Sequence, residues 1–228
     1  MRASDLAYTA LRDDIVEGRL APDTVLAEVE QSERLGVSRT PVREAFSRLT
    51  AAGLAVQSPG RGTVVSPISL DDVDHLFELR LPLETQAAQL AAQRGPAEVF
   101  HALAGRFSAV AGQGLPGEGG SSSEYYDLAG ELDAALDTAV GNPYLSTALQ
   151  ALRVHLVRIR RLARDEPARL AASAGEHRDI CLAIASGDAE LARAVTEVHL
   201  RRSLAYIKSS AASRGRRSEP LKKETVPS

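Results

Sequence analysis

Arginines in the stretch GVSRTPVREAFSRL, residues 36–49, are the side chains of this sequence with the clearest chemistry. In a helix that advances about 100° per residue, Arg39, Arg43 and Arg48 lie on one half of the circumference. The apolar residues of the stretch lie on the other half and predict its buried face: Val42, Ala45, Phe46 and Leu49. An outward guanidinium can bond the edge of a guanine through two N–H groups, or hold a phosphate. The alternative is a solvated helix face with a Glu44–Arg48 ion pair.

The elements around these arginines predict how they are positioned. Amphipathic spacing predicts helices over 6–17, about 27–35 and about 38–52, and two short apolar runs flank the turn SPGRG as in a β-hairpin. Three helices and a hairpin are the plan of a winged helix-turn-helix domain, which we assign to residues 1–66. The arginines then lie on the third helix, which such domains insert into the major groove of DNA.

The start of the third helix and the tip of the hairpin add two features. Ser38 is placed to cap the helix, and Pro41 is tolerated because the N–H groups of the first turn have no helical partner. Those N–H groups and the helix dipole favour an anion such as phosphate. At the hairpin tip, Gly60 beside Arg61 lets the backbone approach a duplex closely, as the wing of such a domain does.

The rest of the chain has only helical patterns. They run over about 70–93, 96–111, 123–140, 143–164, 167–186 and 188–209. We therefore predict a mainly α protein, in which residues 67–70 form a linker and residues 71–210 an antiparallel all-helical bundle. A Gly/Ser loop is expected at 111–124, and a disordered tail without apolar periodicity at 211–228.

Composition and charge limit the class of protein. One Cys among 228 residues excludes an intramolecular disulfide and fits a reducing compartment. No apolar run approaches the ~20 residues of a membrane helix, and the N-terminus lacks a signal-peptide core, so we expect a cytoplasmic protein without a membrane partner. Residues 1–66 hold 8 Lys+Arg against 9 Asp+Glu, whereas residues 201–228 hold 8 against 2. DNA binding by the first domain must therefore use a local patch of arginines.

Residues 6–65 resemble the DNA-binding domain of GntR-family bacterial transcription regulators, and LGVSRTPVREA is the most recognisable run of that family. The resemblance implies DNA contacts from six residues: Ser38, Arg39, Thr40, Arg43, Gly60 and Arg61. The family usually has a basic residue where this chain has Val29, and a Leu where it has Gln31. This departure implies that one phosphate or base contact is missing.

Residues 70–209 resemble the all-helical ligand-binding (FCD) domain of the FadR-type branch, through the runs LFELRLPLETQAAQLAA, LDAALDTAVGNPYL and GEHRDICLAIASGDAELARAVTEVHL. That branch commonly binds a divalent metal ion such as Zn, Ni or Mn, with a small carboxylate effector against it. The resemblance implies metal and effector contacts at Asp133, His177 and His199, with Asp133 in the place of a usual His. Ala129 stands where the branch has an Asp, so the alternative is a purely organic cavity that has lost the metal.

Other polar residues of the helical region have simpler interpretations. Arg80 could hold the carboxylate of the effector or pair with Glu84 one turn away. His155 is expected to face solvent or the cavity, and Cys181 to be a buried, inert thiol. A solvated face is expected for the arginines that follow His155, with the alternative that one of them reaches the cavity: Arg158, Arg160 and Arg161.

These features favour a ligand-responsive transcription regulator, a repressor that binds a near-palindromic operator in double-stranded DNA as a homodimer. A small-molecule effector between the C-terminal helices would shift the pose of the two DNA-binding heads, provided that it binds the two poses with different affinity. The alternative is a metal-dependent hydrolase that uses Asp133, His177 and His199, although the chain has neither an HExxH motif nor a nucleophile elbow. A third interpretation, prompted by Val29, is an interaction module that has lost DNA binding.

Overall fold

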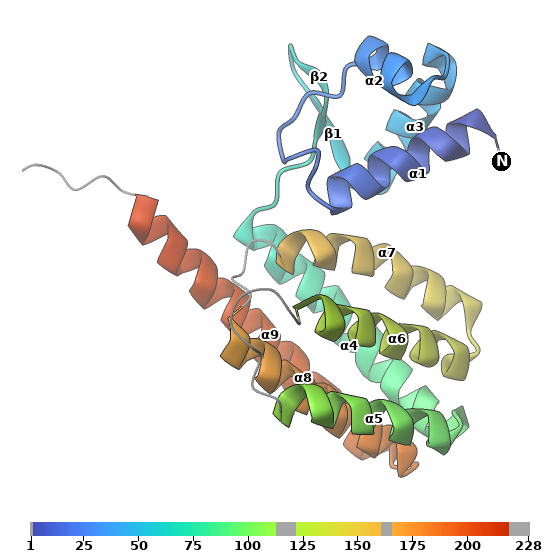
Figure 1. The fold of residues 1–228 in the computed structure, drawn as a ribbon, viewed down its shortest axis with the longest axis vertical. Coiled ribbons are helices and arrows are strands. Elements are labelled where there is room, and N and C mark those ends of the chain that lie inside the picture. The colour runs from blue at the N-terminus through green and yellow to red at the C-terminus, as the bar shows by residue number, and fades with distance from the viewer. Residues whose placement is uncertain (1, 113–121, 161–165, 219–228) are drawn as a thin grey trace, which may run out of the picture. The chain divides into compact units, whose positions relative to one another are not determined.

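The computed structural model describes residues 2–112, 122–160 and 166–218 (Figure 1). Within these ranges it has nine helices and one two-stranded antiparallel sheet, so the predicted mainly α class is confirmed. Contacts divide the chain into two compact units, each made of two segments. The first, which we call the winged-helix unit, is Met1–Val73 with Thr147–Arg161, and the second, the helical unit, is Asp74–Ser146 with Leu162–Ser228.

Residues 1–66 of the winged-helix unit contain three helices and a hairpin: α1 (Ala3–Val16), α2 (Glu28–Leu35), α3 (Arg39–Ala51), β1 (Ala55–Ser58) and β2 (Gly62–Val65). The apolar face predicted for α3 is buried, and Val42 and Leu49 pack in one cluster with Leu11 of α1. The strands pair antiparallel, with Ala55 opposite Val65. The winged helix-turn-helix plan is therefore present as predicted.

A tight turn between α2 and α3 fixes where α3 begins. Gly36 adopts a left-handed φ of 65°, and its N–H and that of the next residue bond carbonyl groups at the end of α2. Glycine suits this turn because a side chain would strain the left-handed conformation. Ser38 then occupies the N-cap position of α3 with an extended backbone, but its hydroxyl makes no capping hydrogen bond. The first N–H groups of α3 therefore receive no cap from Ser38.

A part of helix α7 (Pro143–Arg160) belongs to the winged-helix unit, since residues from Thr147 onward pack there. Arg158 is 4% exposed and donates from Nη1 to the Ser66 hydroxyl at 2.8 Å and from Nη2 to the Ser66 carbonyl. The half-buried His155 places Nε2 3.0 Å from the carbonyl oxygen of Ala52, the C-cap of α3.

The expectation that Arg158 lies on a solvated face is thus wrong. The chain leaves β2 through buried polar groups at Ser66, and Arg158 supplies the donors that they need. His155 is half-buried and contacts the carbonyl oxygen of Ala52 within the same unit. Arg161 and the side chain of Arg160 lie outside the described residues.

The helical unit contains most of α4 together with four further helices: α4 (Leu70–Arg94), α5 (Ala97–Gly112), α6 (Ser122–Val140), α8 (Pro167–Ala185) and α9 (Ala189–Ser218). Its core gathers the apolar faces of α5, α6 and α8, with Phe100 and Phe107 fully buried. None of the described helices is long and apolar enough to cross a membrane.

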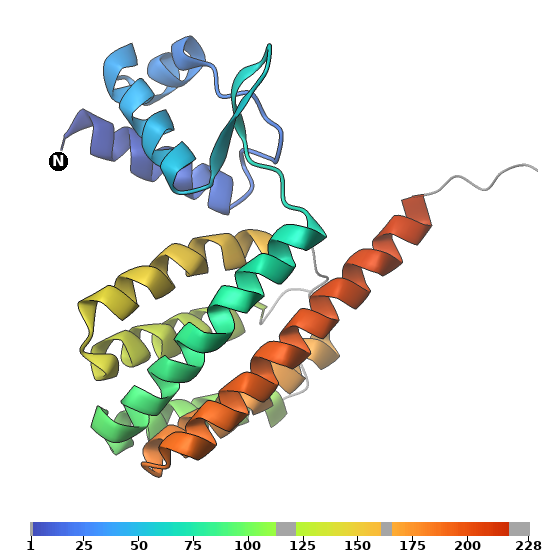
Figure 2. The same cartoon turned by 180° about the vertical axis from the view of Figure 1, so that it is seen from behind.

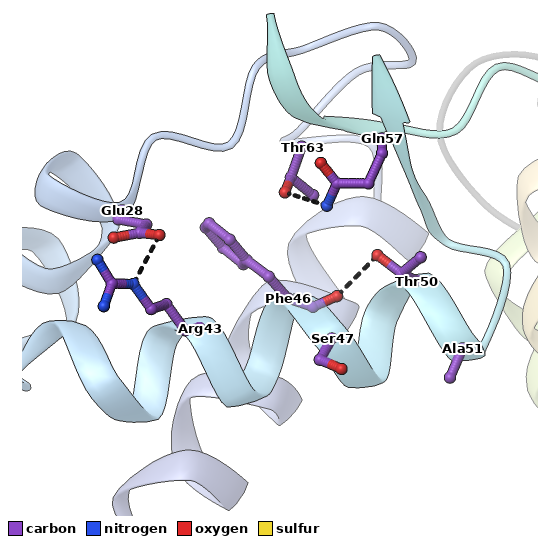
Figure 3. Close-up of a pocket in the computed structure, with 8 residues that line it drawn as sticks. All are labelled: Glu28, Arg43, Phe46, Ser47, Thr50, Ala51, Gln57 and Thr63. Atoms are coloured by element: carbon purple, nitrogen blue, oxygen red, sulfur yellow. Dashed lines mark hydrogen bonds and ion pairs between the residues drawn. The ribbon is translucent and has the colours of Figure 1, made fainter. Parts of the chain in front are cut away.

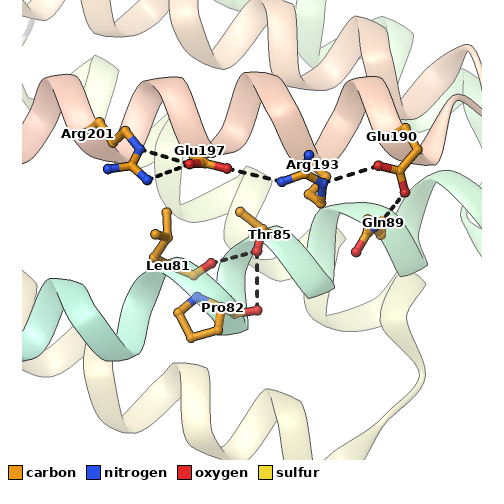
Figure 4. A network of polar contacts seen from close by, with 8 residues as sticks. All are labelled: Leu81, Pro82, Thr85, Gln89, Glu190, Arg193, Glu197 and Arg201. Atoms are coloured by element: carbon orange, nitrogen blue, oxygen red, sulfur yellow. Dashed lines mark hydrogen bonds and ion pairs between the residues drawn. The ribbon is translucent and has the colours of Figure 1, made fainter.

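Helices α4 and α9 run antiparallel, because Asp74 pairs with Lys208 at one end and Gln89 bonds Glu190 at the other (Figure 2). A ladder of alternating charges follows α9 beside α4, as Figure 4 shows: Glu190, Arg193, Glu197 and Arg201. Pro82 lies inside α4, where the hydroxyl of Thr85 bonds the carbonyl groups of Leu81 and Pro82. The contacts Asp74–Lys208 and Gln89–Glu190 join the two longest helices near their ends, whereas the charge ladder and the Thr85 bonds lie within single helices.

Parts of two predicted segments lie outside the described residues, namely 113–121 of the expected Gly/Ser loop and 219–228 of the expected tail. Helix α9 continues to Ser218, whereas the sequence predicts a disordered tail from residue 211. The segment AASRGRRS lacks apolar periodicity, but Ala and Arg have high helix propensity. Extending a helix that is already nucleated costs little, which accounts for the difference.

Candidate nucleic-acid interface and effector site

The outward face of α3 carries the arginines predicted from the sequence. The side chains of Arg39 and Arg43 are 56% and 58% exposed, and Ser38 and Thr40 beside them are exposed as well. They lie at the N-terminal end of α3, where the helix dipole is positive. This arrangement offers two guanidinium groups and a helix N-terminus to an anion or a base edge.

Glu28, the first residue of α2, bonds both arginines. Arg43 donates from Nε to one carboxylate oxygen, a contact drawn in Figure 3, and the two atoms are 2.8 Å apart. Arg39 donates from Nε and Nη2 to the other oxygen at 3.3 and 2.9 Å. The hydrogen bonds from Arg43 and Arg39 lower the pKa of Glu28 to about 2, so its carboxylate is ionised at neutral pH. The sequence alone does not indicate Glu28, because a contact across 11 or 15 residues depends on how α2 packs on α3.

Arg48 lies on a different side of α3. Its Nη1 donates to Asp5 at 2.8 Å, and its guanidinium carbon lies 4.0 Å from the ring centroid of Tyr8 on α1. Among the described contacts, Arg48 therefore pairs with Asp5 and not with Glu44. This geometry favours a role for Arg48 in joining α3 to α1 over a contact with DNA.

An open groove of about 470 Å³ runs between α3 and the hairpin. Its walls come from α2, α3 and both strands: Glu28, Arg43, Phe46, Ser47, Thr50, Ala51, Gln57 and Thr63. Figure 3 shows Glu28 and Arg43 at one end of the groove, with Gln57 and Thr63 on its strand side. The amide of Gln57 donates to the hydroxyl of Thr63 at 2.9 Å. Hydroxyl, amide and guanidinium groups are the side-chain groups that contact phosphates and sugars of DNA.

The hairpin tip presents Arg61 to the outside. Gly60 adopts a φ of 74° with open space around it, so glycine serves the turn and not the packing. The side chain of Arg61 is 54% exposed, its Nε donates to the hydroxyl of Ser58 at 3.2 Å, and its Nη2 lies 3.9 Å from Asp23. The tip thus carries an oriented cation, as a wing that meets a duplex requires.

Two histidines predicted from the sequence lie side by side in the helical unit. The rings of His177 on α8 and His199 on α9 have centroids 4.5 Å apart. The hydroxyl of Tyr125 lies 3.3 Å from Nδ1 of His177. Nδ1 of His199 lies 2.7 Å from Glu176, which accepts two hydrogen bonds from Arg169.

The environment of Glu176 orients His199. Burial of Glu176 opposes its ionisation, but the hydrogen bonds from His199 and Arg169 outweigh this and lower its pKa to about 2. A carboxylate on Nδ1 fixes the orientation of an imidazole and directs its Nε2 to a ligand. His199 is therefore held as a ligand-binding histidine would be.

The third residue of the predicted set, Asp133, does not complete a metal site with the two histidines. In the described part of the chain, no three side chains of His, Cys, Asp or Glu are arranged so that they could hold a metal ion. Ala129 is 6% exposed and contributes a buried apolar side chain where the resemblance implies an Asp. Two imidazoles alone are fewer than the three protein ligands of a catalytic zinc site. The predicted three-ligand set is therefore not formed.

Arg80 takes the second of its two predicted roles. It is 8% exposed, and it donates from Nε and Nη2 to the carboxylate of Glu84 at 2.6 and 3.2 Å. Its guanidinium carbon lies 4.5 Å from the ring centroid of Phe77. Cys181 is fully buried, and burial raises the pKa of its thiol to about 12, as expected for an inert cysteine.

The fold and the arginine face define the class: a winged-helix transcription regulator. Residues 3–65 match the family described as bacterial regulatory proteins, gntR family, and residues 75–202 match the FCD domain. The chain therefore belongs to the GntR family of transcriptional regulators and carries an FCD domain. This confirms the resemblance found in the sequence and places the chain among regulators, not among enzymes such as the hydrolase considered above.

Two similar proteins and one solved structure agree with this family assignment. An HTH-type transcriptional regulator in an unstable DNA locus of Streptomyces ambofaciens is 32% identical over 85% of this chain and 80% of its own length. The probable D-xylose utilization operon transcriptional repressor of Paenarthrobacter nicotinovorans is 31% identical over 89% of this chain and 86% of its own length. A solved structure of a GntR regulator from Rhodococcus sp. RHA1 has a TM-score of 0.71 at 18% identity, covering 91% of this chain and 98% of its own, and thus shares the fold.

Proposed function

We propose that this protein is a repressor that binds a near-palindromic operator in double-stranded DNA as a homodimer in the cytoplasm. The observation that carries the proposal is the pair of exposed guanidinium groups, Arg39 and Arg43, at the N-terminal end of α3. A relative named as a repressor supports the direction of control. A dimer of such units places two α3 helices in successive major grooves, which gives the operator its two-fold symmetry. Gly60 and Arg61 then contact the duplex beside each α3.

The test is operator binding by Arg43→Ala. The operator is first selected from a random duplex library with the full chain, and affinity is then measured by fluorescence anisotropy. A base contact from Arg43 is worth about 1–3 kcal/mol, so affinity should fall about tenfold to hundredfold. Arg106→Ala, which removes a similarly exposed arginine from the helical unit, should leave affinity unchanged. Full operator affinity in Arg43→Ala would refute the assignment and favour an interaction module.

We further propose that the helical unit binds a small organic carboxylate at His177 and His199. The support is a pair of adjacent imidazoles beside Phe107, with His199 oriented by Glu176. The donors present do not fit the divalent ion expected at Asp133, His177 and His199, so the proposed effector contacts the protein directly. A cationic or hydrogen-bonding imidazole is a suitable partner for a carboxylate.

Calorimetric titration with a panel of small mono- and dicarboxylates tests this second proposal. At least one acid should bind in the presence of a chelator and release the selected operator, and His199→Gln should weaken its binding about tenfold or more. The chelator alone should leave the melting temperature unchanged. Binding that appears only after Zn²⁺, Ni²⁺ or Mn²⁺ is added would show instead that a metal completes the site.

A further inference from the structure

We infer that Glu28 is a positioning residue that determines DNA specificity: it holds Arg39 and Arg43 with their outer nitrogens presented to a base, and it offsets charge that would otherwise bind any phosphate. This inference rests on the proposed DNA contacts of the two arginines. Glu28 acts on DNA recognition through Arg39 and Arg43, both by their geometry and by the local charge.

Glu28 fixes the geometry of the two arginines through the nitrogens that donate to it. Arg43 uses Nε for Glu28, and this contact leaves Nη1 and Nη2 for another acceptor. Arg39 donates to Glu28 from Nε and Nη2. Its Nη1 and the second hydrogen of Nη2 stay available to another acceptor. A guanine takes two hydrogen bonds on N7 and O6 from that outer pair of nitrogens. Glu28 therefore restricts both side chains without using the atoms that bond a base.

The restriction has a thermodynamic consequence. A free arginine loses much rotamer freedom when it is held in one geometry, and this loss weakens binding. Arg39 and Arg43 share one carboxylate that is only 31% exposed, so part of their freedom is lost before DNA arrives. Preorganisation of this kind favours the one sequence that matches the fixed positions of the nitrogens.

Glu28 also reduces the local positive charge. Glu28 is ionised and lies within hydrogen-bonding distance of both guanidiniums, so three ionised groups together carry a single positive charge. The neighbouring residue on α2 is Val29, which is 52% exposed and adds no cation. Binding to DNA of any sequence depends on the phosphates that cations neutralise, whereas base contacts depend on orientation. A carboxylate at this place therefore weakens binding to random DNA more than binding to the operator.

The simpler explanation is that Glu28 only stabilises the start of α2, where an acidic residue interacts well with the helix dipole. Glu30 provides a matched control, because it also lies in the first turn of α2 and is exposed. If stabilisation of α2 were the whole role of Glu28, Glu28→Gln and Glu30→Gln would have equal effects. If Glu28 positions the arginines, the effects on DNA recognition differ.

The experiment compares Glu28→Gln, Glu28→Asp and Glu30→Gln as full chains. The probes are the library-selected duplex and a scrambled duplex of the same length and composition, each measured at several salt concentrations. Glu28→Gln should bind the scrambled duplex about three- to tenfold more tightly, and the ratio of the two affinities should fall about tenfold. Glu28→Asp keeps the charge but shortens the reach, so it should bind the scrambled duplex as weakly as the parent and lose operator affinity. Glu30→Gln should match the parent in the affinity ratio.

Two results would overturn the inference. One is a parental affinity ratio in Glu28→Gln when Arg43→Ala has lost operator binding; the other is an equal fall in Glu28→Gln and Glu30→Gln. Full operator binding in Arg43→Ala is a different result, which contradicts the proposed function itself. Circular dichroism of each variant establishes that it is folded, and Glu28→Asp decides the question if Glu28→Gln does not fold.

Discussion

Arg158 should be the side chain through which α7 stabilises the winged-helix unit, and Arg158→Ala tests this. Its guanidinium is buried and donates to both polar oxygens of Ser66, at the residue that follows β2. The Ser66 hydroxyl in turn donates to the carbonyl of Gly53 at 2.8 Å, just after α3. Removing Arg158 therefore leaves two buried acceptors without their donors, between the end of α3 and the end of the hairpin.

The expected magnitude follows from these contacts. A hydrogen bond from a charged donor contributes about 1.5–3 kcal/mol, and a buried acceptor left without a donor costs about 1–3 kcal/mol. Burial lowers the pKa of Arg158, so the buried charge itself has a desolvation cost that the variant no longer bears. We expect Arg158→Ala to reduce the free energy of unfolding by about 2–4 kcal/mol. Arg158→Met keeps more of the volume and should lose less.

A double-mutant cycle with Ser66→Ala isolates the contact. Unfolding in urea, followed by far-ultraviolet circular dichroism, should give a coupling energy of about 1–2 kcal/mol between the two positions. Arg106→Ala, at an exposed ion pair of the helical unit, should leave stability nearly unchanged. A coupling below about 0.5 kcal/mol would refute the reasoning, since independent sites add within that margin.

Three further outcomes are expected. Val29→Arg should restore a phosphate or base contact, so operator affinity should rise and the salt dependence of log K should steepen by about one, as anisotropy at several salt concentrations would reveal. Burial and the charge of Arg158 lower the pKa of His155, so the unfolded chain binds more protons and stability should fall as pH drops below about 6.5; His155→Gln should flatten that part of the stability profile. Gly36→Ala should lower the free energy of unfolding by about 1 kcal/mol from backbone strain alone, because the site is open and φ is 65°; an unchanged melting temperature would contradict this.

Features that depend on local sequence were predictable. Gly36 and Gly53 have left-handed φ values and mark where α2 and α3 end. Gly60 marks the turn of the hairpin in the same way. The faces of α3 follow from spacing alone, because a helix fixes which side chains share a side. The fold class and the exposure of Arg39 and Arg43 therefore agree with the sequence analysis.

Features that depend on how helices pack were not predictable. Nothing local distinguishes Arg158, which is buried, from an arginine on a solvated face; the difference comes from Ser66, a partner 92 residues away. The same holds for Glu28, whose contacts depend on the packing of α2 against α3. The role of Asp133 is implied only by the resemblance to the family, and among the described residues Asp133 does not form a three-ligand metal group with His177 and His199.

The charge of the winged-helix segment limits how this regulator can bind DNA. Residues 1–66 have slightly more acidic than basic side chains, so the surface as a whole does not attract a duplex. Each arginine placed to contact DNA also has a carboxylate close by: Glu28 beside Arg39 and Arg43, and Asp23 at 3.9 Å from Arg61. Affinity for random DNA grows with the number of phosphates neutralised, whereas discrimination between bases grows with the orientation of donors. Arginines that are paired with carboxylates and held in one orientation lose much of the affinity for random DNA but keep the discrimination between bases. Neutralising Asp23 or Glu28 should therefore strengthen binding to random DNA, while removing Arg43 weakens binding to the operator most.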